Sequence, residues 1–263
     1  MAVLGRLLVF VATAYLCVAA ILWAFQSSFF YPAPQTAAPL MPGYEEVTLE
    51  TDDGLNLRAF YHQADPGLPT LVYFHGNGGN LSGAGVSNAA LVEAGIGALL
   101  VEYRGYGGNP GEPSEEGFYR DGEAAMEWLR AQGFDFDEII IVANSIGGGV
   151  ATEMALRHDP AALVLVAPFT SLPDAAQANI WWMPSHLLVE DQYRNAEKIG
   201  RIDAPVLIQH GDADDLVPHD HGKRLAELAP QGEFQTFQGS GHALSFERRS
   251  QEARRDWILS LRD

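Results

Sequence analysis

Apolar residues in this chain form one long run near the N-terminus and then a series of short runs separated by polar, glycine-rich segments. The short runs have the length of strands, and stretches suited to helices lie between them. The predicted strands are residues 70–74, 97–103, 138–144, 163–167, 206–209 and 234–237. Residues 44–51 and 55–62 flank Asp52-Asp53-Gly54, a turn signal that predicts an antiparallel hairpin.

Helices are predicted between these strands, at 114–132, at 146–158 and, after the last strand, at 244–261. Strands that alternate with helices and are apolar throughout are typical of a parallel sheet covered on both faces. The hairpin adds antiparallel strands at one edge. The pattern therefore predicts an α/β domain.

The long apolar run covers residues 7–25, nineteen positions without a charge. As a helix rising about 1.5 Å per residue it would extend about 28 Å, close to the ~30 Å hydrocarbon core of a bilayer. Aromatic residues gather at its far end, at Trp23 and at 29–31. That placement is typical of the aromatic belt of a membrane span. An uncleaved transmembrane anchor is the preferred interpretation.

Two other interpretations of this run stay open. A signal peptide would be cleaved at small residues, for which Ala19-Ala20 is the candidate, but the apolar run continues beyond it. A helix packed into the globular domain is the third possibility. Arg6 is the charged side chain nearest the run, and the positive-inside rule then places the domain on the non-cytoplasmic side of a single-pass membrane protein.

The chain is accordingly divided into three parts: a transmembrane anchor at 1–28, a proline-rich tether at 29–43 and an α/β domain at 44–263. The net charge is −18, which disfavours a nucleic-acid partner because such proteins need a basic surface. The single cysteine, Cys17, permits no disulfide within the chain. The histidines and the cysteine of the chain are not spaced like metal ligands, so no metal or cofactor is expected.

One strand ends in a way that points to chemistry. The run at 139–144 stops at Ser145, and a glycine-rich helix start follows. A strand, a sharp turn at serine and a helix form a nucleophile elbow, in which the positions two residues either side of the serine must be small. These positions hold Ala143 and Gly147, where glycine is usual at both. The alternative is a buried strand followed by a helix that the serine caps.

Polar residues also follow the other strands. His75-Gly76-Asn77-Gly78-Gly79-Asn80 follows the strand at 70–74, a segment with Asp212, Asp214 and Asp215 follows 206–209, and His242 follows the last strand. Functional groups gather at the carboxyl ends of strands in open α/β sheets. A serine, an acid and a histidine in this chain order match the α/β-hydrolases.

On these residues the chain resembles an α/β-hydrolase of the membrane-anchored branch, related to serine aminopeptidase-like hydrolases and to the palmitoyl-protein thioesterase-like group. The resemblance covers residues 25–262 and is carried by FQSSFFYP, FHGNGGN, VEYRGYGGNPGEPSEEG, ANSIGGGVA, APFTSL, PVLIQHGDADDLVP and GSGHALSF. It implies the α/β-hydrolase fold: a mostly parallel sheet of the eight-stranded type, helices on both faces and a short lid.

The resemblance also implies residue roles. Ser145 would be the nucleophile and His242 the base that activates it. The pattern H-G-x-x-D-x-x-V-P selects Asp214 as the acid that orients the histidine. The backbone amides of Asn77 and Ile146 would form the oxyanion hole.

The segment at 169–204, where this fold often carries its lid, contains Trp181-Trp182. We expect these tryptophans either to bind substrate in an acyl-chain groove or to touch the membrane surface; a small hydrophobic core under a loop is the alternative. The predicted activity is hydrolysis of a carboxylic ester or thioester, the EC 3.1 class, on a small or lipid-like acyl substrate. A serine peptidase with the same triad and a non-catalytic binding domain on this fold remain alternatives.

Overall fold

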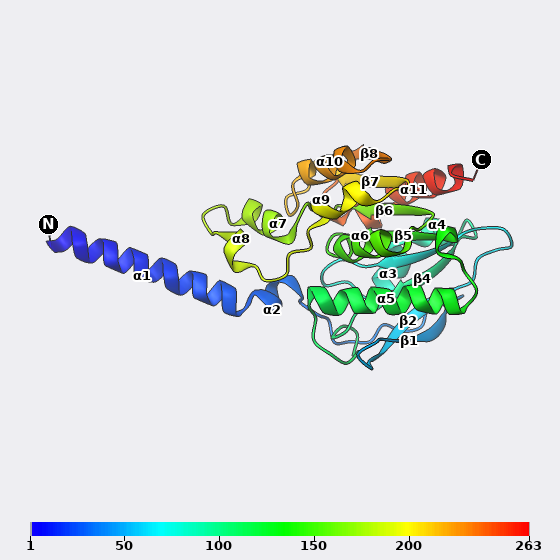
Figure 1. Ribbon diagram of the computed structural model, residues 1–263, viewed down its shortest axis with the longest axis horizontal. Coiled ribbons are helices and arrows are strands. Elements are labelled where there is room, and N and C mark those ends of the chain that lie inside the picture. Colours follow the sequence, from blue (N-terminus) through cyan, green and yellow to red (C-terminus); the bar gives the residue numbers. More distant parts are fainter. Residues whose placement is uncertain (1, 263) are drawn as a thin grey trace.

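A single sheet of eight strands runs through the domain, as the computed structural model in Figure 1 shows for residues 2–262. The strands are β1 (Glu45–Glu50), β2 (Asn56–His62), β3 (Thr70–Phe74), β4 (Gly97–Val101), β5 (Ile139–Asn144), β6 (Ala162–Val166), β7 (Val206–Gly211) and β8 (Gly232–Phe237). Their order is β1-β2-β4-β3-β5-β6-β7-β8. The hairpin strand β2 pairs antiparallel with β1 and β4, and all other pairs are parallel.

Helices cover both faces of the sheet. The helices are α1 (Ala2–Ala24), α2 (Gln26–Phe30), α3 (Leu81–Ser87), α4 (Ala89–Val92), α5 (Glu115–Ala131), α6 (Gly147–His158), α7 (Leu172–Asn179), α8 (Ser185–Leu188), α9 (Asn195–Lys198), α10 (His219–Leu228) and α11 (Arg248–Ser260). Side chains of α5, α6 and α10 share one hydrophobic core with the sheet, and those of α3, α4 and α11 share the other.

Successive side chains of the central strands point to opposite faces of the sheet, which explains how one sheet supports two cores. In β5, Ile139, Ile141 and Ala143 face the core under α5 and α6, whereas Ile140 and Val142 face the opposite core. Because both faces are buried, the strand is apolar at every position rather than at every second one. The continuous apolar runs in the sequence thus predicted the sheet correctly.

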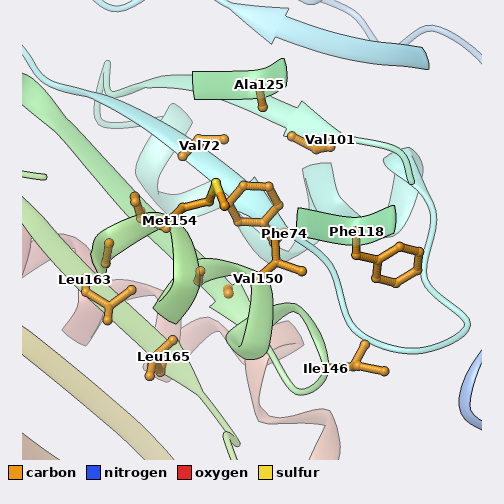
Figure 2. Close-up of a cluster of buried hydrophobic side chains, with 14 of the residues drawn as sticks. Val72, Phe74, Val101, Phe118, Ala125, Ile146, Val150, Met154, Leu163 and Leu165 are labelled. Atoms are coloured by element: carbon orange, nitrogen blue, oxygen red, sulfur yellow. The ribbon is translucent and has the colours of Figure 1, made fainter. Parts of the chain in front are cut away.

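The core under α6 lies directly beneath the predicted elbow. Figure 2 shows Val72 and Phe74 of β3 lying with Val150 and Met154 of α6, and Ile146 at the edge of the same cluster. The side chains of a close-packed interior resist displacement, because moving one of them opens a void or forces a clash. The residue that follows Ser145 is therefore fixed by the core.

The N-terminal helix α1 projects away from the sheet (Figure 1). Within residues 2–262 it is the one helix long and apolar enough to cross a membrane, with a mean hydropathy of 2.4 over its most apolar window. A signal sequence would have the same length and composition. The short helix α2 follows it after Phe25 and leads into the domain.

The proline-rich segment that follows α2 lies along the domain surface. The amide of Gly107 donates to the carbonyl of Pro34 over 2.7 Å, and the side chain of Gln35 donates to the carbonyl of Gly105 over 2.8 Å. Ala38 is buried in the core that contains α3. The segment has no helix or strand and is attached to the domain at Pro34, Gln35 and Ala38.

The chain after the last strand differs from the predicted helix at 244–261. A 3₁₀ turn (His242–Phe246) comes first, Glu247 is extended, and only then does α11 begin. The hydroxyl of Ser250 donates to the carbonyl of Leu244 across this break. His242 thus lies in this turn, and α11 begins only at Arg248.

Candidate active site

Ser145 sits at the turn between β5 and α6 in a left-handed backbone conformation, with φ of 51°. Non-glycine residues adopt this conformation at a cost of roughly 1–2 kcal/mol. Two hydrogen bonds hold it: the Ser145 amide donates to the carbonyl of Val166 over 2.9 Å, and the Gly148 amide donates to the Ser145 carbonyl over 2.8 Å. The turn lifts the side chain out of the sheet plane.

Close contact between α6 and the neighbouring strand explains the small residues beside Ser145. A Cβ on Gly147 would lie 2.3 Å from the carbonyl oxygen of Phe74 and 2.7 Å from that of His75. No side chain fits there. On the other side of the turn, Ala143 is fully buried in the core, which accommodates its methyl group.

Three predicted residues from three separate strand ends meet in one line of hydrogen bonds. The Nε2 atom of His242 lies 2.9 Å from the Oγ of Ser145, and its Nδ1 atom lies 2.8 Å from Oδ2 of Asp214. A carboxylate can only accept, so Nδ1 carries the proton and Nε2 is free to accept from the serine hydroxyl. This arrangement can remove a proton from Ser145 as it attacks an electrophile.

Asp214 is the carboxylate that the structure joins to His242, and its side chain has no exposed surface. Its Oδ1 accepts from the amides of Leu216 and Val217 over 3.0 and 2.9 Å. Although burial alone raises the pKa of Asp214, hydrogen bonds from His210, His242 and Val217 hold it well below its usual range. The group is therefore a permanent anion at physiological pH.

His210 is a second histidine on this carboxylate, which the sequence analysis did not identify. Its Nε2 atom lies 3.0 Å from the carbonyl oxygen of Val217 and 3.2 Å from Oδ2 of Asp214. The carbonyl is an acceptor, so Nε2 carries the proton and donates to both oxygens. His210 is the last residue but one of β7, and its position next to the loop acids was the available signal.

The other two acids of this loop lie elsewhere. Asp212 is exposed and accepts from the amide of Gly239, which joins its loop to the one before His242. Asp215 is exposed, and its carboxylate has no hydrogen-bond partner within residues 2–262. Asp214 is the acid that faces the histidine, because its carboxylate accepts hydrogen bonds from the amides of Leu216 and Val217 and is turned inward.

Asn77 and Ile146, whose backbone amides are the predicted oxyanion hole, both line the cavity in front of Ser145. Neither amide donates to another group in the described part of the chain. The loop that carries Asn77 is held by His75, whose buried ring contacts the carbonyl of Gly76 through Nδ1 and the carboxyl of Glu102 through Nε2. Two free, fixed donors beside a nucleophile can bind a developing oxyanion.

A cavity of about 410 Å³ opens in front of Ser145. Its lining residues come from five regions of the chain: Leu22, Trp23, Gln26, Phe29, Phe30; Asn77; Ser145, Ile146; Phe169, Leu172, Ala175, Ala176, Asn179, Ile180, Met183, Ser185, Leu188, Val189; and Leu216, Val217. None of these described residues is charged. The size and the apolar wall suit a small organic or acyl ligand.

The structure does not place Trp181 or Trp182 on the wall of this cavity. Trp181 is 80% exposed, and Trp182 packs edge-on against Tyr15 of α1, with ring centroids 6.1 Å apart. The residues on either side, Ile180 and Met183, line the cavity instead. The chain turns here between α7 and α8, so neighbouring side chains point in different directions.

The first two helices supply a wall that the sequence analysis did not anticipate. Ala19, Leu22, Gln26 and Phe30 are at least partly covered, whereas most of α1 is exposed. Ala19 and Leu22, three residues apart, lie on one face of α1, and Gln26 and Phe30, four apart, lie on one face of α2. Gln26, directly after the apolar run, was the available signal of this wall, because an isolated membrane helix has no need of a glutamine there.

No group of three or more metal-ligating side chains is found within residues 2–262. The polar side chains of the site are instead joined to one another by hydrogen bonds.

Comparisons with known proteins identify the family of the fold. Residues 69–193 match the family described as alpha/beta hydrolase fold. An uncharacterised protein of Mycobacterium tuberculosis is 37% identical over 230 residues, which cover 84% of this chain and 82% of the relative.

Solved structures show the same fold. An alpha-beta hydrolase from Vibrio vulnificus superposes with a TM-score of 0.75 at 24% identity and covers 90% of this chain and 92% of its own. A membrane phospholipase A, described as a bacterial virulence factor, has a TM-score of 0.64 at 16% identity and covers 99% of this chain and 98% of its own. The second similarity extends over nearly the whole chain, α1 included.

Adjacent glycines test the close contact at the turn. Gly147→Ala should destabilise the protein by about 1–3 kcal/mol and lower hydrolytic activity at least about 100-fold, because the new methyl must push the strand away from Ser145. Gly148→Ala is the control, since its Cβ would meet only Leu165 and Pro168, both at 3.7 Å. It should be neutral or stabilising by up to about 1 kcal/mol. Urea denaturation and ester turnover measure both; equal behaviour of the two variants would contradict the prediction.

Proposed function

The chain belongs to the α/β-hydrolase family, and on that premise we propose that it is a membrane-anchored serine hydrolase that cleaves carboxylic ester or thioester bonds. The observation that carries the proposal is the line of hydrogen bonds from Ser145 through His242 to Asp214, which ends in an apolar cavity. A structural serine would have no need of a histidine, a buried anion and two free amides around it.

In the proposed acylation step the Oγ of Ser145 attacks the carbonyl carbon of the ester while Nε2 of His242 takes its proton. The carbonyl oxygen becomes an oxyanion and accepts hydrogen bonds from the amides of Asn77 and Ile146, each worth about 2.7–4 kcal/mol in the transition state. The tetrahedral intermediate then collapses. The bond to the alcohol or thiol breaks, and His242 returns the proton to that leaving group.

Deacylation repeats these steps with water in place of the serine. His242 takes a proton from water, the hydroxide attacks the acyl carbon, and the bond to Oγ breaks as the proton passes to Ser145. The products are a carboxylic acid and an alcohol or thiol. Asp214 stays ionised throughout, because the hydrogen bonds from His210, His242 and Val217 keep its pKa low. Its charge stabilises the imidazolium that forms twice in each cycle.

The wall of the cavity favours an acyl substrate over a peptide. A peptidase that recognises a chain terminus needs a charged group to pair with it, and none of the described lining residues carries a charge. An acyl chain needs only apolar surface, which these residues provide. Esterase or thioesterase chemistry therefore suits the site better than peptide hydrolysis.

The proposal includes α1 as an uncleaved membrane anchor. Leu22 and Trp23 of α1 and Gln26 of α2 line the cavity. Cleavage after Ala20 would separate these residues from the rest of the membrane helix. Arg6, before the apolar core, favours a cytoplasmic N-terminus and a catalytic domain on the opposite side.

A fluorophosphonate probe tests the nucleophile. The full-length protein should become labelled on Ser145, because the serine oxygen displaces fluoride from phosphorus, and p-nitrophenyl butyrate should be hydrolysed. Ser145→Ala should abolish both while circular dichroism shows an unchanged fold. A folded wild-type protein that neither takes the label nor hydrolyses the ester would end the proposal.

Two neighbouring acids test the assignment of the carboxylate. Asp214→Asn should lower kcat for p-nitrophenyl butyrate about 10⁴-fold, because an amide no longer holds the proton on Nδ1 of His242. Asp215→Asn, an equal change at an exposed and unpaired side chain, should leave kcat unchanged. A large loss in Asp215→Asn with a small one in Asp214→Asn would reverse the assignment.

Membrane extraction tests the anchor. The protein should stay in the membrane fraction after treatment with high salt and alkaline carbonate and be released by detergent. A chain of 263 residues by mass would show that the helix is retained. Release by carbonate, or a mature chain that begins after residue 20, would contradict the anchor.

A further inference from the structure

The cavity in front of Ser145 reaches the membrane helix. Its lining residues include Ser145 as well as Leu22 and Trp23 from the last turn of α1. Phe29 and Phe30 of α2 and apolar residues of the lid, residues 169–204, line the same cavity. The same helix that would anchor the protein therefore borders the space for its substrate.

Polar contacts join the first two helices to the lid. The side chain of Gln26 accepts from the amide of Glu190 over 2.9 Å and donates to the carbonyl of Leu188 over 3.3 Å. The hydroxyl of Tyr31 donates to the carboxylate of Asp191 over 2.5 Å. Burial, together with that carboxylate, raises the pKa of Tyr31 well above its usual value, so the hydroxyl remains a donor.

A further contact lies far along the membrane helix. The hydroxyl of Tyr15 donates to the carbonyl of Trp182 over 3.3 Å, and the two rings pack edge-on. Tyr15 precedes Phe25, the end of the apolar run, by ten residues, or about 15 Å of helix. This is half the ~30 Å hydrocarbon thickness. A helix that spans the bilayer therefore carries this part of the lid into the near leaflet.

The surface of the lid in this region suits hydrocarbon. Between residues 175 and 189 the one ionisable side chain is His186. Trp181 is 80% exposed and Leu187 is 84% exposed, so their large apolar side chains have no cover from the protein. Figure 1 shows α7 and α8 projecting from the domain on the side from which α1 leaves. We call residues 180–187 the lid tip.

Side chains donate hydrogen bonds to three consecutive carbonyls of the lid tip, and irregular backbone inside a membrane needs such partners. Gln177 donates to the carbonyls of Ile180 and Trp181 over 3.4 and 2.7 Å. The Trp182 carbonyl accepts from Tyr15. These bonds replace the water that would hydrate the same groups at an ordinary protein surface.

From these observations, and resting on the proposed hydrolase function, we propose that the lid tip inserts into the near leaflet beside α1 and that the cavity receives the long acyl chain of a membrane lipid ester directly from that leaflet. The acyl chain lies between Leu22 of α1 and the apolar lid residues, with its carbonyl carbon at Ser145. The ester that the enzyme cleaves is thus a component of the bilayer that holds the enzyme.

Substitutions on two adjacent residues of α1 test the route. Full-length protein is reconstituted in vesicles of dioleoylphosphatidylcholine and dioleoylphosphatidylglycerol, and release of oleic acid is compared with hydrolysis of p-nitrophenyl butyrate. Leu22→Trp fills the α1 end of the cavity and should lower the ratio of lipid to butyrate turnover at least about tenfold. Ile21→Trp, an equal change at an exposed residue outside the cavity, should keep the wild-type ratio.

A polarity-sensitive fluorophore tests insertion of the lid tip without relying on activity. It is attached to Leu187→Cys or, as the control, to Val86→Cys on α3, both in a Cys17→Ser background; both native side chains are exposed. In the same vesicles, the label at 187 should emit at shorter wavelength and resist an aqueous quencher, whereas the label at 86 should be quenched. Equal quenching at the two positions would overturn the insertion.

The outcomes separate the two proposals. A wild-type protein that does not hydrolyse p-nitrophenyl butyrate would count against the proposed serine hydrolase activity itself. A protein that hydrolyses butyrate but releases no oleic acid, or in which Leu22→Trp and Ile21→Trp have the same ratio, retains the hydrolase and loses the lipid substrate.

Discussion

Ser145 holds a left-handed backbone conformation in the small space between the end of β5 and the start of α6, and the positions of the other site residues are set relative to it. The close approach of Gly147 to the carbonyls of Phe74 and His75 fixes how far α6 stands from β3. That distance brings the loop after β3, and with it the amide of Asn77, to the side of the serine. The strain at one residue is supported by a core that cannot shift without opening voids.

Electrostatic preorganisation is the second constraint. Asp214 is withdrawn from water, but it accepts hydrogen bonds from two backbone amides and lies next to two histidines. Burial of an unpaired carboxylate would raise its pKa and neutralise it. The surrounding donors reverse that effect, so the anion faces His242 at any physiological pH. His210 has a positioning role here, since it touches Asp214 and has no contact with the serine.

The first two helices extend the site beyond the hydrolase domain. In many enzymes of this architecture the substrate pocket is closed by insertions of the domain itself, because function is placed on loops around a constant fold. Here the lid is short, and Gln26 and Tyr31 complete it from the N-terminal side. Residues of α1, of α2 and of the lid therefore border the same cavity as Ser145.

The sequence by itself determined the α/β sheet, its covered faces and the three strand ends that hold Ser145, Asp214 and His242, because buried parallel strands are apolar throughout and functional side chains follow them directly. The break before α11 escaped prediction, since only the need to return His242 to the sheet interrupts that helical pattern. Which of three loop acids faces His242 could be taken from a family pattern alone, and the amides of Leu216 and Val217 give the physical reason. The contact of α1 with the lid was decided by tertiary structure, because Tyr15 and Trp182 lie far apart along the chain and a uniformly apolar helix does not show which of its faces is covered.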